Sequence, residues 1–488
     1  MPRGTPRTRV AALKPKKRGW LGACVRPILA LGIACTLVTG SRADSSVDTS
    51  NSVDTSRYSD QPTPLSPGTF PARPAPLIEI GQNPFLGNGY IAPGFVMPTG
   101  AVWQPVFIVY GDVLTALQTF DSGTGQTTEW ANRMDLFGNL YLTPTERILV
   151  GFRPFDTEGQ AVDGVSSGYR FKPGDGNWVN GLNGKLTTGF FEGDFGQIFK
   201  NLDPNDVKSL DYGFAIGRQN FLLQDGLLVN DTMDAIGITH SSLFLFGSNA
   251  AHVTALYAWN NIDRGDNIKA DDAHMFGLNS SFDYVDSTVD FDVLYVTAPD
   301  RSGGDGLYAG IGMTRRFELV NFTARVVTSQ AIDKQSDAVS TGTLLFNQLS
   351  YSPAHTDNLV YLDTFVGIDR FSSAARDPDV GGPLGQVGLL FANVGVGSYG
   401  AAVSNASSNT IGTAIGYQMY FAKRRHQLVV ELGARTDTKG PGESTVALGA
   451  NWQQAMGRHL ILIFGGFIGA QENVDKSYGL RSELEAKF

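Results

Sequence analysis

The sequence has almost no cysteine and no apolar run long enough to cross a membrane as a helix. Its two cysteines, Cys24 and Cys35, both lie in an N-terminal segment that we expect to be removed. A mature chain without cysteine has no disulfide and no thiolate metal site, so backbone pairing and packing must hold it together. The apolar run at 27–40 is shorter than the ~20 residues that a membrane-spanning helix needs.

The N-terminal 43 residues have the composition of a secretory signal peptide. Residues 1–26 contain eight basic and no acidic residues, and the apolar run follows directly. Small residues at Ser41 and Ala43 then predict cleavage after Ala43. A lipoprotein whose mature chain starts at Cys35 is the alternative, although the apolar run continues past that cysteine.

Basic residues are scarce in the predicted mature chain. Removing the signal deletes nine of the 38 Lys and Arg residues and none of the 47 Asp and Glu residues, which leaves 29 basic residues and a net charge of −18. A nucleic-acid partner is therefore not expected, because binding phosphates requires a surplus of Lys and Arg.

Residues 44–75 have the composition of a tether rather than of a folded domain. The pentapeptide Ser-Val-Asp-Thr-Ser occurs at 46–50 and again at 52–56, and five prolines follow between 62 and 74. A segment rich in Ser, Asp and Pro buries too little apolar surface to fold, so we expect a disordered tether in the periplasm. Residues 76–488 then form the folded domain.

Alternation of polar and apolar residues is the main signal in that domain. In residues 130–142 one face is apolar and the other is polar and charged, the turn at 143–146 contains a proline, and residues 147–153 alternate again. This pattern predicts a β-hairpin. The apolar face consists of Trp130, Met134, Leu136, Leu140, Leu142, Ile148, Val150 and Phe152, and the opposite face contains Arg133, Asp135, Arg147 and Arg153.

The last quarter of the chain repeats such units, with short turns and longer polar connections in alternation. The final segment, 478–488, sets an apolar face that ends at Phe488 against a charged face, and only Ser482 departs from the apolar face. This segment resembles the C-terminal targeting signal of bacterial outer-membrane barrels. The resemblance implies that the barrel-assembly machinery recognises Phe488 and that the segment closes the barrel on the first strand after the tether.

Together these patterns predict an all-β fold, a transmembrane antiparallel β-barrel of about 16–18 strands. A barrel of this width encloses a water channel, so the expected function is an outer-membrane porin for passive diffusion of small hydrophilic solutes, with saccharides as one candidate class. We expect contact with outer-membrane lipid, no cofactor and no enzymatic activity; whether the barrels form homotrimers is left open. The predicted pore-lining residues are Arg133, Asp135, Arg147, Arg153, Arg218, Glu431, Arg435, Arg481, Glu483 and Glu485.

Residues 217–219 (Gly-Arg-Gln), followed by Asp225 and an apolar return, resemble a strand of the alginate-export porin family. That resemblance supports the barrel class, suggests a polysaccharide solute and implies that Arg218 faces the lumen. Strand alternation instead places Arg218 on the same face as Phe214 and Ile216. For Arg218 to face the lumen, the strand therefore needs a bulge near Gly217.

Other functional patterns in the sequence are weak. Asp266, Asp271 and Asp272 could bind Ca²⁺ in an outer loop, although a solvated loop explains them better. A G-x-S-x-G string at 164–168 lacks the strand and helix that a nucleophile elbow needs, and a G-x-G-x-x-G string at 395–400 lacks a helix. The alternatives to a porin are a surface or envelope-anchoring barrel and, more remotely, an outer-membrane hydrolase.

Overall fold

A computed structural model describes residues 74–81, 94–121, 123, 125–155, 169–174, 176–179, 181–205, 210–440, 443–472 and 476–488. The predicted signal peptide, all of the predicted tether up to residue 73 and the G-x-S-x-G string lie outside these residues. Within them, no helix is long and apolar enough to cross a membrane.

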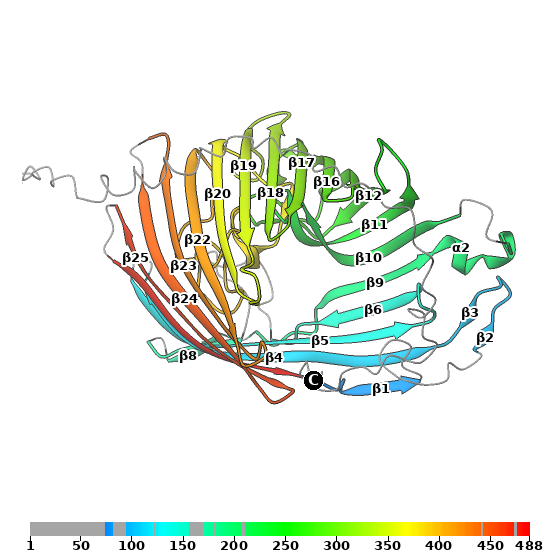
Figure 1. The fold of residues 1–488 in the computed structure, drawn as a ribbon, viewed down its shortest axis with the longest axis horizontal. Coiled ribbons are helices and arrows are strands. Elements are labelled where there is room, and N and C mark those ends of the chain that lie inside the picture. The colour runs from blue at the N-terminus through cyan, green and yellow to red at the C-terminus, as the bar shows by residue number, and fades with distance from the viewer. Residues whose placement is uncertain are drawn as a thin grey trace, which may run out of the picture.

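The described residues form a closed antiparallel barrel of 18 strands, at the upper end of the predicted range (Figure 1). Each strand pairs with the next one in chain order, and the last strand pairs with the first to close the sheet. The barrel strands are β4 (Val106–Asp121), β5 (Gln126–Tyr141), β6 (Arg147–Phe152), β9 (Leu186–Asp194), β10 (Tyr212–Leu223), β11 (Val229–Leu243), β12 (Ala250–Asn260), β15 (His274–Asp283), β16 (Ser287–Thr297), β17 (Gly306–Phe317), β18 (Val320–Ala331), β19 (Gly342–Tyr351), β20 (Leu359–Asp369), β22 (Thr410–Phe421), β23 (His426–Asp437), β24 (Ser444–Met456), β25 (Leu460–Gln471) and β26 (Ser477–Lys487).

Several short elements are not part of this ring. The hairpin β7–β8 extends the sheet beside β5, and β1 pairs with the start of β4. These elements are β1 (Ile78–Gly81), β2 (Phe95–Val96), β3 (Val102–Trp103), β7 (Tyr169–Lys172), β8 (Asn177–Val179), β13 (Ile262–Asp263), β14 (Lys269–Ala270), β21 (Ala375–Arg376), the helix α2 (Phe195–Ile198) and the 3-10 helices η3 (Lys200–Leu202), η4 (Asp300–Ser302) and η5 (Pro378–Val380).

The hairpin predicted at 130–153 is present as β5 and β6, with Tyr141 opposite Arg147. The final strand is also present, but its partner differs from the prediction. β26 pairs with β4, whereas β1, the first described strand after the tether, pairs with β4 beyond the C-terminus. Phe488 exchanges both backbone hydrogen bonds with Gly111, and the C-terminus lies beside β1 in Figure 1.

In the last quarter of the chain, short turns and longer connections lie at opposite ends of the barrel, as predicted. One end, here called the turn end, has the short turns 284–286, 318–319 and 457–459 and also holds β1 and Phe488. The other end, the loop end, has the long connections 261–273 and 370–409. Antiparallel pairing places successive connections at alternate ends.

The connection 370–409, here called the internal segment, enters the barrel. Its strand β21 pairs in parallel with the start of β11, and its later residues bond to β4, β5 and β23 on other parts of the wall. A segment that reaches several parts of a closed wall must cross the lumen. Apolar residues fill the space between it and strands β11–β20, including fully buried Tyr308 and Phe391.

Candidate functional site

Four charged side chains meet where the internal segment approaches β5 and β6. Arg133 Nε and Arg153 Nε each lie 2.8 Å from a different oxygen of Asp135, and Arg153 Nη1 lies 3.0 Å from Asp379 Oδ2. Arg133 Nη1 also donates to Gly395 O at 3.0 Å. Three predicted pore-lining residues therefore come together, and two of them hold the internal segment.

Glu431 holds the middle of the internal segment from β23. Its fully buried carboxylate accepts the backbone N–H groups of Leu389 at 2.6 Å and Leu390 at 2.8 Å, and the Tyr361 hydroxyl also donates to it. Gly388 has a φ of 61°, and a Cβ there would lie 2.5 Å from Glu431 Oε2. The carboxylate approaches these N–H groups closely because residue 388 lacks a side chain.

Glu129 on β5 binds a second glycine turn in the same way. This buried carboxylate accepts the Ser398 backbone N–H and, at 3.0 Å, the Ser398 hydroxyl, while Gln118 Nε2 donates to it at 2.7 Å. Gly397 precedes Ser398 and has a φ of 66°. Two wall glutamates thus bind two positive-φ glycine turns, and the sequence analysis missed Glu129 because it considered only the 130–142 part of this strand.

The remaining predicted residues on the inner face divide into two groups. Arg435 Nη1 donates to the carbonyls of Ser404 at 2.6 Å and Ala406 at 3.0 Å, so it also holds the internal segment. The others pair within the wall: Arg147 with Glu192 at 2.5 Å, Arg481 with Glu483, and Glu485 with Lys487 at 3.1 Å.

Arg218 lies on the outer side of the barrel, contrary to what the alginate-porin resemblance implies. Its register partner is Asp234, and their same-face neighbour Ile216 is 42% exposed, whereas the alternate residue Ala235 is buried in the interior cluster. Gly217 has a φ of 127°, but the register with β9 and β11 continues through it without a shift, so Arg218 keeps the side of Ile216. There Arg218 forms a two-bond ion pair with Asp234.

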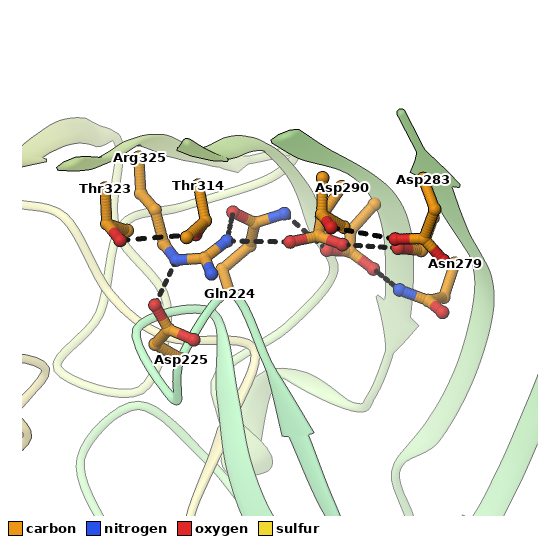
Figure 2. Close-up of polar contacts among 11 residues, drawn as sticks. Gln224, Asp225, Asn279, Asp283, Asp290, Thr314, Thr323 and Arg325 are labelled. Atoms are coloured by element: carbon orange, nitrogen blue, oxygen red, sulfur yellow. Dashed lines mark hydrogen bonds and ion pairs between the residues drawn. The ribbon is translucent and has the colours of Figure 1, made fainter. Parts of the chain in front are cut away.

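The turn between β10 and β11 also bends onto the inner wall (Figure 2). Gln224 Nε2 donates to Asp292 at 2.7 Å, and Arg325 Nη1 bonds to Gln224 Oε1 and Asp290, both at 3.1 Å. Asp225 completes the contact by pairing with Arg325 Nε. The sequence predicted an acidic turn here but gave no sign of its partners, which lie on β16 and β18.

The three calcium candidates have separate partners. Asp271 pairs with Lys269 at 2.8 Å, Asp272 with Arg301 at 2.5 Å, and Asp266 accepts the Ile268 N–H at 3.1 Å. Across the described residues, no group of three or more His, Cys, Asp or Glu side chains is arranged to hold a metal ion.

Two further carboxyl groups meet where the internal segment begins. Burial, followed by the charge of Asp377, raises the pKa of Asp263 on β13 to about 7. Burial also raises the pKa of Asp377, which lies in the internal segment next to η5, and the charge of Asp379 adds to that effect. Both groups therefore retain a proton at a higher pH than an exposed aspartate would.

No family model matches the sequence, and no curated protein matches it either. Solved structures do match its fold. Pseudomonas aeruginosa OccK2 (OpdF) in complex with glucuronate has a TM-score of 0.53 at 9% identity, over 78% of this chain and 98% of that one. The outer membrane protein OpdK of the same species has a TM-score of 0.51 at 10% identity, and Acinetobacter baumannii OccAB2 has a TM-score of 0.52 at 9% identity. Each of these matches also covers 78% of this chain and 98% of the other.

Proposed function

We propose that the protein is an outer-membrane porin through which small hydrophilic solutes diffuse passively. The observation that carries this function is the internal segment, which crosses a closed 18-strand barrel and is held there by charged side chains of the wall. A segment of this kind narrows a channel and surrounds the passing solute with fixed charges and backbone dipoles.

The fold supports this proposal, because the solved structures that share it include one described as an outer membrane protein. The solute class extends the proposal further. OccK2 was solved with glucuronate, a sugar acid, which is consistent with saccharides as candidate solutes for this chain. The paired charges at Arg133, Asp135, Arg153 and Asp379 suit a pore that accepts neutral and weakly charged solutes.

Placement in the outer membrane, removal of the signal peptide and recognition of Phe488 by the assembly machinery belong to the same proposal. The outward face of β26 supports the placement, because Leu480 is 64% exposed while Glu483 on the inner face is 3% exposed. This arrangement is expected of a strand with lipid on one side and a lumen on the other.

Single-channel recording in planar bilayers tests the function. Purified, refolded protein is expected to give discrete conductance steps, and the reversal potential in a KCl gradient would report the preference between cations and anions. A barrel that only anchors the envelope would give no steps above the lipid background, and that result would contradict the proposal.

A further inference from the structure

The outer surface of the barrel is hollowed by an apolar groove of about 820 Å³. It extends across the outward faces of β23–β26, β4 and β5 to the hairpin that begins with β7. Its size is within the range of sites that bind small molecules, ~300–1,000 Å³. Gln118, Glu129 and Arg481 also border the groove, although the register places their side chains on the inner face.

One continuous row of register partners shapes the groove. Trp452, Phe464, Ser482, Leu117, Trp130 and Phe171 stand opposite one another in turn on β24, β25, β26, β4, β5 and β7. Every member of this row except Ser482 is large and apolar. Large side chains therefore form the two sides of the groove, and Ser482 forms part of its floor.

The adjacent row of register partners has small residues close to Ser482, where Ala450 stands opposite Gly466. The sequence marked the same place independently, because Ser482 is the one residue that departs from the apolar face of the final strand. A leucine or phenylalanine there would complete that face and fill the hollow.

We propose that this groove holds an acyl chain of an outer-membrane lipid, which occupies the space that a large residue at position 482 would take. The inference relies on the membrane placement in the proposed function but not on conduction. An apolar chain suits the groove because burying each CH₂ group against apolar surface is worth about 0.8 kcal/mol.

The two ends of the groove differ in polarity, and this difference orients the lipid. Towards the loop end, the exposed Thr119 and Thr128 hydroxyls bond to each other at 2.9 Å, and Gln126 Nε2 donates to Thr119 at 3.1 Å. These hydroxyl and amide groups can bond to the ester of an acylated lipid whose headgroup lies towards the loop end. The indole N–H of Trp130 donates to Thr115 at 2.7 Å, so this indole presents an apolar face to the chain.

Phosphatidylglycerol with dibrominated chains tests the site, because bromine quenches tryptophan fluorescence at contact and Trp130 and Trp452 flank the groove. The mature chain, folded in detergent, is expected to show saturable quenching, and native mass spectrometry is expected to show one retained phospholipid. Ser482→Phe should weaken the saturable phase by about tenfold, because it removes the space for several CH₂ groups.

Ile468→Phe is the matched control. Ile468 is 64% exposed on the outward face of β25 and does not line the groove, so this variant should quench like the wild type. Ala450→Leu fills the groove from another strand and should reproduce the effect of Ser482→Phe if that variant folds poorly. Equal quenching in all four proteins, or an oligomer that Ser482→Phe dissociates and that excludes the lipid, would overturn the proposal.

Conductance separates this inference from the proposed function. Because Ser482 faces away from the lumen, Ser482→Phe channels should conduct like the wild type while binding less lipid. Absence of conductance in every variant would contradict the porin function and leave the lipid result unaffected.

Discussion

Arg153 at the end of β6 pairs with Asp379 in the internal segment at 3.0 Å, although 226 residues separate them along the chain. Arg153 belongs to the inner face that alternation predicted, whereas Asp379 lies in a connection for which the sequence predicted no structure. In the proposed channel, such pairs determine how much of the lumen the internal segment occupies.

Replacing Asp379 should loosen the first part of the internal segment. Asp379→Asn is expected to lower the barrier to segment movement by about 1 kcal/mol, since both side chains are partly exposed to solvent. Single-channel records should then show more frequent current fluctuations. Arg153→Gln should do the same, and the double variant should add little to either one; full additivity would indicate that the two residues act separately.

Adding a methyl group at Gly388 should displace the internal segment from Glu431. Gly388→Ala places a side chain at a φ of 61° and 2.5 Å from the carboxylate, at a conformational cost of about 1–2 kcal/mol before any contact is lost. A higher mean conductance and a lower thermal unfolding midpoint are expected. Gly440→Ala is the control, because Gly440 also has a positive φ, but a Cβ there would meet no atom within 4 Å. If both variants change the conductance alike, backbone strain alone explains the result.

Stability should fall as the pH rises from about 4 to about 7. The folded protein keeps a proton on Asp263 up to about pH 7, whereas the unfolded chain releases it near pH 4, so the folded state binds more protons across this interval. The thermal unfolding midpoint should therefore be lower at pH 8 than at pH 5. Asp263→Asn should reduce that difference, and Asp333→Asn, in an exposed loop, should leave it unchanged. An equal pH response in all three proteins would argue against this carboxyl group.

Deleting Phe488 should impair assembly before it changes any pore property. Phe488 exchanges two backbone hydrogen bonds with Gly111, at 2.8 and 3.0 Å, at the seam that closes the barrel. Outer-membrane levels of the truncated protein should fall on immunoblots, while the channels that do assemble should conduct normally. Phe488→Trp keeps a terminal aromatic residue and should restore the level; an unchanged level in the truncated protein would exclude this role.

Much of the wall could be predicted from the sequence, because a strand in a membrane barrel has one side that faces water and one apolar side that faces lipid. Arg133, Asp135 and Arg153 were placed on the inner side from local alternation alone, and the structure puts them there. For Arg218, strand alternation was a better guide than the resemblance to alginate-export porins. Alternation put Arg218 on the same face as Ile216, and the structure places both on the outer side.

The internal segment could not be predicted in the same way. Its backbone is irregular, and its partners lie on the distant strands β5, β11 and β23. No periodic pattern in the sequence predicts these contacts. The G-x-G-x-x-G string at 395–400 was the only local sign, and it was discounted because no helix follows.

The sequence by itself therefore determined the strands at 130–153 and in the last quarter of the chain, their inward and outward faces, and the all-β barrel fold, because each of these depends on residues two positions apart. Tertiary structure alone decided that the wall charges bind the chain's own internal segment, and that the small residue Ser482 lies in one row of register partners with five large apolar residues. These features depend on which distant strands the closed barrel brings together, and closure is a property of the whole sheet.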